Sequence, residues 1–295
     1  MSGFSADWLA LREPFDRRAR AAAIDAFALP SLAQRWRAAR GGAGPSVLDL
    51  ACGSGANFRA LAPRLGPGQR WRLVDHDPAL LAAVPGALAA WAEHQGYTLR
   101  GIGADAIGID GPGFGAEVTL EALDLAHDLH RLELADTQLV TASALLDLVS
   151  AAWLEALVGH ARDAQAAMLF ALSVDGRVGW TPADPADAAI DRLFAAHQRR
   201  DKGFGPALGA QAPAVAGRLI GDAGYVVQQV SSDWDIEGDD AMLAAMVDGM
   251  AQAAREQAGA ADRALVDAWQ ARRHAMRRST CLNVGHIDLF AKVRP

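Results

Sequence analysis

The stretch that decides the fold, Ser46–Asp77, reads SVLDLACGSGANFRALAPRLGPGQRWRLVDHD. It combines a hydrophobic strand, a tight pair of glycines, a helix and a second strand that ends in an acid. A unit of this kind binds nucleotides, because the turn brings backbone N–H groups and a helix N-terminus to the ligand. Two ligands fit this outline, a nicotinamide dinucleotide and a sulfonium nucleoside, and they imply different chemistry.

The residues around the two glycines favour the sulfonium nucleoside. In the dinucleotide fingerprint G-x-G-x-x-G/A, a small third residue lets the helix pack against the strand, but here that position is Phe58. Asp49 lies four residues before Gly53, and a carboxylate there is unfavourable beside a pyrophosphate. The same carboxylate is favourable beside a ligand that carries an ammonium and a sulfonium. The turn therefore predicts a cationic nucleoside.

A second acid, Asp75, ends the next strand 20 residues after Gly55. A carboxylate at that place can accept hydrogen bonds from both ribose hydroxyls. Nicotinamide-binding folds share this feature, so it supports nucleoside binding without choosing between the two ligands. Asp77 and Pro78, which follow, are typical of a helix N-cap and first helical residue.

The segments VLDLACGSGANF and LVDHDP resemble the first two motifs of the class I S-adenosylmethionine-dependent methyltransferases. The resemblance covers about Ser46–Leu172, and Tyr225–Trp234 with His286–Val293 fit the family's final antiparallel pair. It implies that Asp49, Gly53 and Gly55 line the methionine moiety, that Asp75 holds the ribose, and that an acid after the third strand receives the adenine amino group. The cofactor-binding residues expected from it are Asp49, Ala51, Gly53, Gly55, Asp75, His76, Asp105 and Ala106.

Strand-like and helix-like segments alternate after residue 45, which indicates a mostly parallel sheet with helices on both faces. The expected strands of the core are Ser46–Leu50, Arg70–Val74, Tyr97–Gly103, Thr137–Ala142 and Ala166–Leu172. The expected helices between them are Asn57–Leu65, Pro78–Gln95, Leu120–Leu132 and Leu148–Gln165. The fold class expected is Rossmann-like α/β with seven strands.

One domain, 1–295, is expected, with four parts. Residues 1–44 form an N-terminal helical cap, 45–173 the cofactor-binding core, 174–215 an acceptor-side insertion, and 216–295 the final strands with a helical insertion at 239–278.

Composition indicates a soluble protein with an ordinary core. The chain has 295 residues, 51% of them hydrophobic, and a net charge of -7, which makes nucleic acid an unlikely partner. Cys52 and Cys281 are interpreted as packed thiols in a reducing cytoplasm, and the N-terminus lacks a signal peptide pattern. No apolar run is long enough to span a bilayer. Paired histidines at ligand spacing are absent, so no metal site is predicted.

The acceptor side is expected around the segment IDRLFAAHQRRDKGFGPALG. His197 continues an apolar helical stripe and is the candidate base or acceptor contact, with a satisfied core histidine as the alternative. The expected substrate-binding residues are Arg200, Lys202, Phe204 and Trp180, and the basic members suggest a polar or anionic acceptor.

Weaker candidates lie elsewhere in the chain. Asp147 contacts the acceptor or caps the next helix, and Arg12 and Asp16 belong to a lid or to a solvated helix face. His286 is interpreted as a structural turn residue. The basic run Ala271–Arg278 could meet RNA, but on an acidic chain a salt-bridged helix face is the favoured interpretation.

The predicted function is methyl transfer from S-adenosylmethionine to a small molecule by direct displacement, in which the protein aligns the reactants and excludes water. The alternatives are an RNA or protein methyltransferase, a nicotinamide oxidoreductase, and a non-catalytic binder of S-adenosylmethionine.

Overall fold

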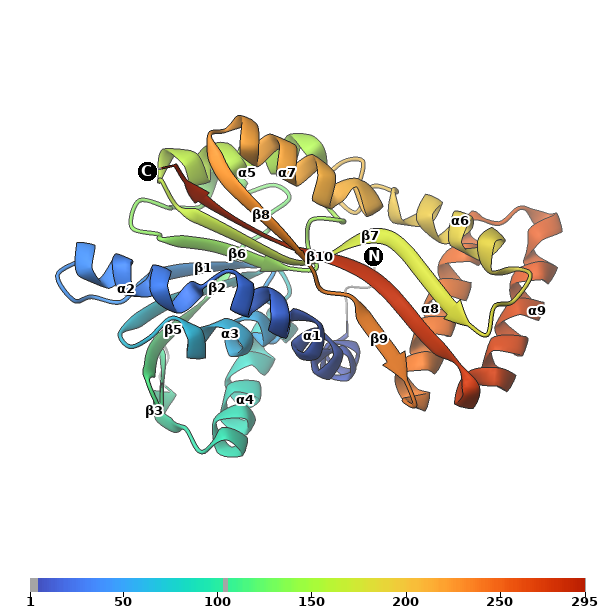
Figure 1. The fold of residues 1–295 in the computed structure, drawn as a ribbon, viewed down its shortest axis with the longest axis horizontal. Coiled ribbons are helices and arrows are strands. Elements are labelled where there is room, and N and C mark those ends of the chain that lie inside the picture. Colours follow the sequence, from blue (N-terminus) through green and yellow to red (C-terminus); the bar gives the residue numbers. More distant parts are fainter. Residues whose placement is uncertain (1–4, 103–105, 295) are drawn as a thin grey trace.

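The computed structural model describes residues 5–102 and 106–294. Within them, strands join in one sheet in the order β3-β4-β5-β2-β1-β6-β7-β10-β8, with β9 paired to β10 (Figure 1). The ten strands are β1 (Ser46–Leu50), β2 (Gln69–Asp75), β3 (Thr98–Ile102), β4 (Ile107–Gly111), β5 (Phe114–Ala122), β6 (Leu139–Ser143), β7 (Ala167–Thr181), β8 (Tyr225–Ser231), β9 (Trp234–Glu237) and β10 (Cys281–Val293). The α/β class with helices on both faces is confirmed, whereas the expected count of seven strands is wrong.

Seven of these strands form the core of the sheet. From β5 through β2, β1 and β6 to β7 every pairing is parallel, and β10 then runs antiparallel to both β7 and β8. The additional strands are β3 and β4, which extend one edge, and β9, which pairs with the first part of β10. The carboxyl ends of β5, β2, β1 and β6 therefore meet at one edge, where open α/β sheets bind ligands, and β7 continues beyond it.

The expected position of the third core strand is corrected by the structure. Residues 98–102 form β3, an edge strand antiparallel to β4, and the place beside β2 belongs to β5. The helix expected at Leu120–Leu132 is also wrong, since its first residues end β5. Inward-facing Phe114, Ala116 and Val118 alternate along β5, and Gly113, with φ +80°, makes the turn from β4.

Helices cover both faces of the sheet. They are α1 (Ala6–Ala26), α2 (Leu29–Ala39), α3 (Ala56–Leu61), α4 (Pro78–Gln95), α5 (Ala151–Asp163), α6 (Asp187–Gln198), α7 (Ala212–Asp222), α8 (Asp240–Gln257) and α9 (Ala260–Met276). In Figure 1, α1–α4 lie below the sheet and α5 and α7 above it. Two buried hydrophobic clusters fill these layers, one on each face.

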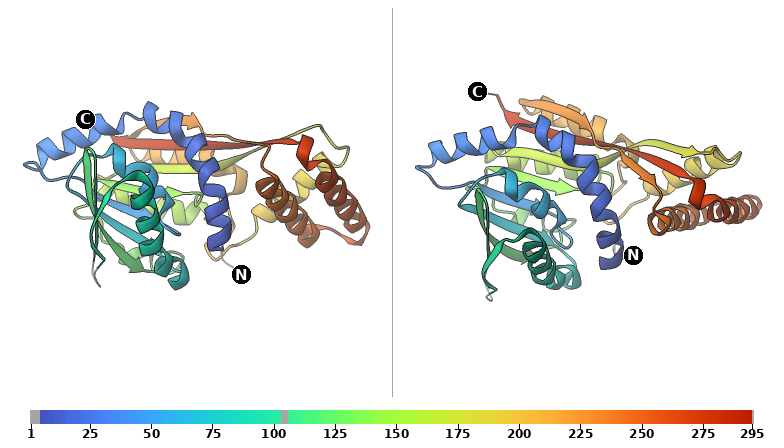
Figure 2. Two further views of the ribbon diagram at one scale, coloured as in Figure 1. Left: turned by 90° about the horizontal axis from the view of Figure 1, so that it is seen from below. Right: turned by 60° about the horizontal axis from the view of Figure 1, so that its bottom comes forward.

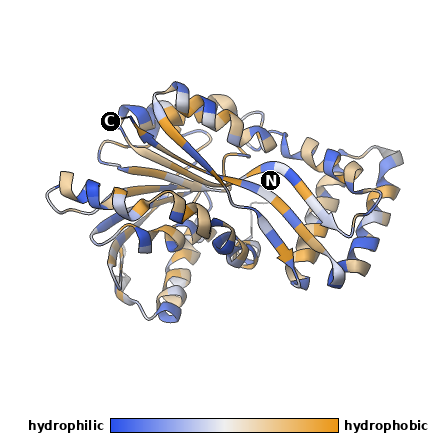
Figure 3. Cartoon of the chain, viewed as in Figure 1, coloured by the Kyte–Doolittle hydropathy of each residue, from blue (hydrophilic) through white to orange (hydrophobic). Residues whose placement is uncertain are grey.

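The far ends of β7 and β10 carry a separate helical part, made of α6, α8 and α9 (Figure 1). A third hydrophobic cluster holds it together around Trp269, Val247 and Ile190, which are all fully buried or nearly so. Figure 3 shows hydrophobic and hydrophilic residues alternating along α8 and α9, as expected of helices with one buried side. No helix in the described ranges is long and apolar enough to cross a membrane.

Helix α1 lies between the two halves of the molecule. Figure 2 shows it crossing from the side of α3 and α4 toward α8. Ser5 caps its first turn by accepting a hydrogen bond from the Trp8 N–H, and a buried ion pair from Arg20 to Asp288 ties its second half to β10. Helix α1 therefore covers part of the sheet edge at which the parallel strands end.

Candidate functional site

The turn between β1 and α3 has an unusual backbone. Ala51, Gly53 and Gly55 all adopt positive φ angles, of 51°, 54° and 82°. Glycine adopts this region freely, but at Ala51 it costs energy, and such strain is found most often at binding and catalytic sites. A Cβ atom at Gly53 would lie 2.9 Å from Cδ1 of Leu9 in α1, so a larger residue there would require the Leu9 side chain to move.

Asp75, at the end of β2, holds this turn in place. Its Oδ2 accepts a hydrogen bond from the Gly53 N–H at 2.8 Å, and its Oδ1 accepts one from the Asp77 N–H at 3.0 Å. His76 lies beside it on the surface, with Nδ1 3.4 Å from Asp75 Oδ1. The carboxylate predicted to hold a ribose therefore lies at the glycine turn, and it also fixes the backbone there.

Asp49 is fully buried beneath the same turn. Asn57 in α3 donates a hydrogen bond from Nδ2 to Asp49 Oδ1 at 2.6 Å and another to Thr141 Oγ1 at 3.1 Å. Asp49 Oδ2 has no partner within the described part of the chain. Burial raises the pKa of Asp49 to about 7, against smaller lowering effects of Asn57 and Arg20. An unpartnered buried carboxylate oxygen fits a cationic ligand and does not fit a pyrophosphate.

The residues expected at the adenine end lie at or beyond the edge of the described ranges. Asp105 lies outside the described residues, and Ala106 precedes the inserted strand β4. Because β5 takes the third place in the parallel sheet, the acid that follows this strand is Asp124. It accepts a hydrogen bond from His127 Nδ1 at 3.0 Å, which lowers its pKa. The turn GPG at 111–113 is the sequence signal for the hairpin that shifts this position.

His197, the expected base, forms a hydrogen bond with Glu256 at the surface of the helical part. Its Nε2 lies 3.1 Å from Glu256 Oε2, and Arg200 Nη1 donates to the same oxygen at 2.8 Å. Burial and the nearby Lys202 lower the pKa of His197, and burial together with Arg200 lowers that of Lys202. His197 and Arg200, two of the residues expected to bind the methyl acceptor, therefore both contact Glu256 of α8.

Of the two expected aromatic residues, Trp180 is buried and Phe204 is half-buried. Phe204 packs edge-on against Trp153 of α5, with ring centroids 5.3 Å apart. Trp180 is 7% exposed and packs against Trp269, with the Arg273 guanidinium 4.4 Å from its ring centroid. Packing that the sequence does not show buries Trp180, so its expected place in a substrate pocket is corrected, whereas the role of the half-buried Phe204 stays a prediction.

A different polar group lies where α1 meets the carboxyl end of β6 and the middle of β7. Asp147 follows β6, its Oδ1 is buried without a partner among the described residues, and burial raises its pKa to about 6 while Arg12 and Lys202 act in the opposite direction. It does not cap α5, because Ser150 does so. Arg12 is 8% exposed and paired with Asp16, so this pair is not a solvated helix face.

His286 of β10 belongs to the same region. Its Nδ1 donates to the Val284 carbonyl oxygen at 3.0 Å, and its ring packs against Trp234 at 4.9 Å. Since a carbonyl only accepts, the Nδ1 atom carries the proton and Nε2 keeps a lone pair. Burial, with Arg12, lowers the pKa of His286 to about 4, so the ring is neutral. The interpretation of His286 as a turn residue is corrected to a buried strand residue beside α1.

The basic run Ala271–Arg278 is neutralised by acids. Arg272 donates to both oxygens of Asp184, and Arg273 is buried against Asp187. His274 pairs with Asp248, and both Arg277 and Arg278 pair with Asp240. The favoured interpretation, a salt-bridged helix face, therefore describes this helix. No cluster of metal-binding side chains occurs in the described ranges 5–102 and 106–294.

No family model matches the chain, and no curated protein matches its sequence. Similar solved structures include a cyclopropane synthase from Mycobacterium tuberculosis, at 12% identity and a TM-score of 0.41 over 85% of this chain and 79% of that one. A phosphoethanolamine N-methyltransferase from Haemonchus contortus, in complex with S-adenosylhomocysteine, has 10% identity and a TM-score of 0.40 over 86% and 49%. An arsenic(III) S-adenosylmethionine methyltransferase from Chlamydomonas reinhardtii has 17% identity and a TM-score of 0.40 over 85% and 64%.

At such identities these similarities concern the backbone alone. The assignment of the fold rests on this chain's own strand order and turn. Seven core strands with a closing antiparallel pair, and a glycine turn between β1 and α3 flanked by Asp49 and Asp75, give the chain the fold of the class I S-adenosylmethionine-dependent methyltransferases.

Proposed function

We propose that this protein transfers a methyl group from S-adenosylmethionine to a small-molecule acceptor. The observation that carries the proposal is the buried Asp49 carboxylate, which has one oxygen without a partner in the described part of the chain, beneath a strained glycine turn. A buried charge of this kind destabilises the folded protein unless a ligand of opposite charge binds beside it. Among nucleosides, one that bears a sulfonium and an ammonium supplies that charge.

The residues around the turn have separate tasks in this proposal. Asp75 holds the ribose hydroxyls while keeping the turn closed through the Gly53 N–H. Asp49 and Asn57 face the cationic end of the cofactor. Asp124, His76 and Ala106, together with Asp105, remain candidates for the adenine end. The cofactor supplies an electrophilic methyl group, and the chain's part is to hold the acceptor in line and exclude water.

A small acceptor is favoured over RNA because the one dense basic run is already paired with acids. Helix α1 also covers the turn closely, with Leu9 against Gly53. We place the acceptor between α1, the carboxyl end of β6 and the middle of β7, near Asp147 and His286. His197, Arg200 and Lys202 stay candidates for an outer contact with a polar or anionic acceptor.

The test is transfer of labelled methyl from S-adenosylmethionine into small-molecule, protein and RNA fractions of a cell extract. We expect label in the small-molecule fraction, and at least about a 100-fold loss with Asp49→Ala. Asp77→Asn is the matched control, because asparagine caps a helix as well as aspartate does. Label in RNA or protein would contradict a small acceptor, and tight cofactor binding without label would indicate a binder.

Asp147 is expected to accept the acceptor's proton. Its pKa of about 6 leaves it ionised at pH 7 and above, so it can take a proton as the acceptor's heteroatom attacks the methyl carbon and the C–S bond breaks toward sulfur. With the acceptor that the label identifies, Asp147→Asn should lower kcat by about 100-fold or more and remove the decline in kcat below pH 6. A kcat profile that keeps this decline in the variant would assign it to another group.

A further inference from the structure

His286 of β10 carries a hydrogen-bond acceptor that no group in the described part of the chain uses. The side chain is 3% exposed, and its Nδ1 donates to the Val284 carbonyl oxygen at 3.0 Å, which leaves a lone pair on Nε2. No N–H or O–H group of the described residues donates to Nε2, and this nitrogen is not among the polar atoms that are wholly buried without a partner. A ligand can therefore reach it.

The backbone before His286 is shaped to fix the direction of its side chain. The register between β10 and β7 shifts between Val284 and His286, which places Gly285 in a β-bulge. A Cβ atom at Gly285 would collide with Asp175 Oδ1 and would lie 2.8 Å from the Cβ atom of Arg177. Since the Arg177 Cβ is fixed to its backbone, a larger residue would push the two strands apart. Bulges of this kind occur often next to active sites, where they change the direction of a side chain.

Asp233, just before β9, holds the backbone of His286. Its Oδ1 accepts a hydrogen bond from the His286 N–H at 3.0 Å, and the Ser232 N–H donates to the His286 carbonyl oxygen at 2.9 Å. Arg177 donates to both oxygens of Asp233, each at 2.8 Å. Both backbone groups of His286 are thus fixed, and an exposed arginine of β7 orients the carboxylate that holds one of them.

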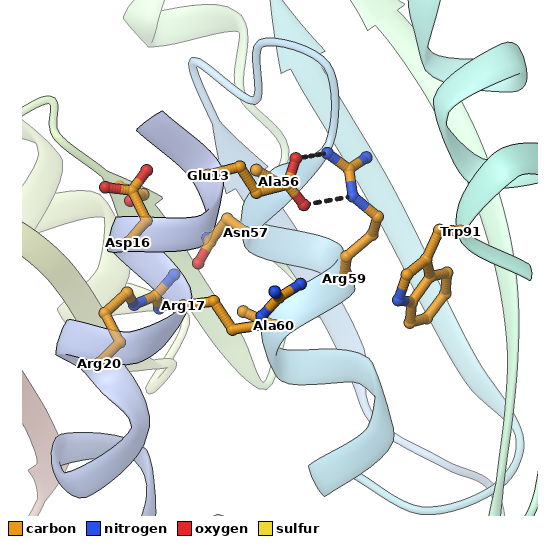
Figure 4. A pocket seen from close by; sticks show the side chains of 10 residues that line it. Glu13, Asp16, Arg17, Arg20, Ala56, Asn57, Arg59, Ala60 and Trp91 are labelled. Atoms are coloured by element: carbon orange, nitrogen blue, oxygen red, sulfur yellow. Dashed lines mark hydrogen bonds and ion pairs between the residues drawn. The ribbon is translucent and has the colours of Figure 1, made fainter. Parts of the chain in front are cut away.

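The ring of His286 is connected to α1 through Trp234. The two ring centroids lie 4.9 Å apart, and the Trp234 indole N–H donates to Asp16 Oδ1 at 3.0 Å. Figure 4 shows the Asp16 carboxylate on the side of α1 that is turned away from Arg59. Arg12 binds Asp16, and its guanidinium lies 5.1 Å from the Trp234 ring centroid. The imidazole therefore faces the part of α1 that carries Arg12 and Asp16.

The charges around His286 keep Nε2 unprotonated. Burial and then Arg12 lower the pKa of His286 to about 4, against opposite effects of Asp233 and Asp175. Arg12 also lowers the pKa of Asp147, the base expected for methyl transfer, so the carboxylate and the imidazole lie around the same guanidinium. Asp147 Oδ1 and His286 Nε2 are both acceptors without a donor among residues 5–102 and 106–294. Such a pair is complementary to a ligand with O–H or N–H hydrogens.

We propose that His286 binds the methyl acceptor: its Nε2 accepts a hydrogen bond from an O–H or N–H group of that molecule, and Arg177, through Asp233, positions the imidazole. This inference rests on the proposed function and narrows the class of acceptor. It includes alcohols, phenols, and primary and secondary amines. It excludes sulfides, tertiary amines and alkenes that carry no such hydrogen.

Transfer of labelled methyl into the small-molecule fraction of a cell extract, measured at several dilutions of that fraction, tests the role of His286. His286→Asn keeps a donor for the Val284 oxygen but has no acceptor where Nε2 lies. It should raise the half-saturating amount of the fraction about 10- to 100-fold. His286→Gln can place its Oε1 there and should recover most of this loss. The affinity of both variants for S-adenosylhomocysteine, measured by calorimetric titration, should stay within about 2-fold of that of the wild type.

Arg177→Gln tests the positioning role. It should raise the same half-saturating amount about 3- to 10-fold, because the imidazole is held less well, and leave the affinity for S-adenosylhomocysteine unchanged. The matched control is Arg64→Gln, which removes another exposed ion pair of an arginine with an aspartate and should change neither quantity. Equal effects of the two variants on the half-saturating amount would overturn the positioning role of Arg177.

The outcomes separate this inference from the proposed function. If the wild-type protein transfers no label, the proposed function fails and the inference fails with it. If the wild type transfers label and His286→Asn has the same half-saturating amount, or if His286→Gln recovers nothing, only the role of His286 is overturned. A labelled product whose parent compound has no O–H or N–H hydrogen, identified by mass spectrometry, would also overturn it. So would nitrogen-15 NMR spectra of the ligand-free protein in which the proton of His286 is on Nε2, and this measurement does not depend on methyl transfer.

Discussion

Replacing Asp288 by alanine is expected to lower the free energy of unfolding by about 3–5 kcal/mol, because it removes one partner of a buried ion pair. Asp288 is fully buried in β10 and accepts hydrogen bonds from three separate segments of the chain. The donors are Arg20 of α1 at 3.4 Å, the Leu172 N–H of β7 at 2.8 Å and the Ser232 hydroxyl at 2.5 Å. Its loss would leave the buried Arg20 guanidinium without its ion-pair partner.

Urea unfolding followed by circular dichroism measures this effect. The matched control is Asp25→Ala, which removes the exposed ion pair to Arg64 and should cost less than about 1 kcal/mol. Equal changes in the two variants would show that the attachment of α1 to the sheet does not depend on Asp288. A change in the m-value, the slope of the free energy of unfolding against urea concentration, would instead indicate that α1 is detached in the native state.

The second large effect is expected at Asp49, where stability and ligand binding should change in opposite directions. Its pKa rises from an ordinary value of 3.8 to about 7 on folding, chiefly through burial. The folded state therefore binds more protons than the unfolded state between these two values, so the contribution of Asp49 to stability falls as pH rises from about 4 to 7. Since one pKa unit corresponds to about 1.4 kcal/mol, the cost at pH 8 is at most about 4 kcal/mol.

Asp49→Asn should therefore raise the Tm of the ligand-free protein at pH 8 and leave it nearly unchanged at pH 4. The same change should lower the affinity for S-adenosylmethionine at pH 8 by more than about 10-fold, because the neutral amide does not compensate the charge of the cationic ligand. Thermal unfolding at both pH values and calorimetric titration measure the two effects. A fall of both Tm and affinity at pH 8 would mean that the ionised carboxylate stabilises the turn itself.

Much of the fold follows from patterns within short segments. The segments Ser46–Leu50, Arg70–Val74 and Asn283–Val293 are strand-like in sequence and lie within β1, β2 and β10. Residues 97–103 are predicted as the third core strand, whereas that strand is β5. Residues 98–102 are strand-like in themselves, and only the antiparallel pairing of β3 with β4 makes them an edge strand. Strand propensity depends on nearby residues, but the order of strands in a sheet depends on which neighbouring strands and helices bury the apolar side chains of each strand.

The cofactor turn can be predicted from the sequence because its geometry is local. Gly53 and Gly55 have the positive φ angles that their residue type permits, and Asp49 lies on the strand that leads into them. Even Asp75, 22 residues from Gly53, follows from one strand–helix–strand unit, since parallel neighbours end at the same edge. The sequence by itself thus determined the turn, its two acids and the class of ligand that they favour.

The acceptor side depended on tertiary structure. His197 lies on an apolar stripe, but its ring pairs with Glu256, 59 residues away on α8. Arg20 looks like one of several arginines in an amphipathic helix, yet it is buried against Asp288, 268 residues away. The sequence does not contain the partners of a side chain. They are set when α1 and the helical part pack on the sheet, because burial there decides which charges must be paired and which polar atoms are left for a ligand.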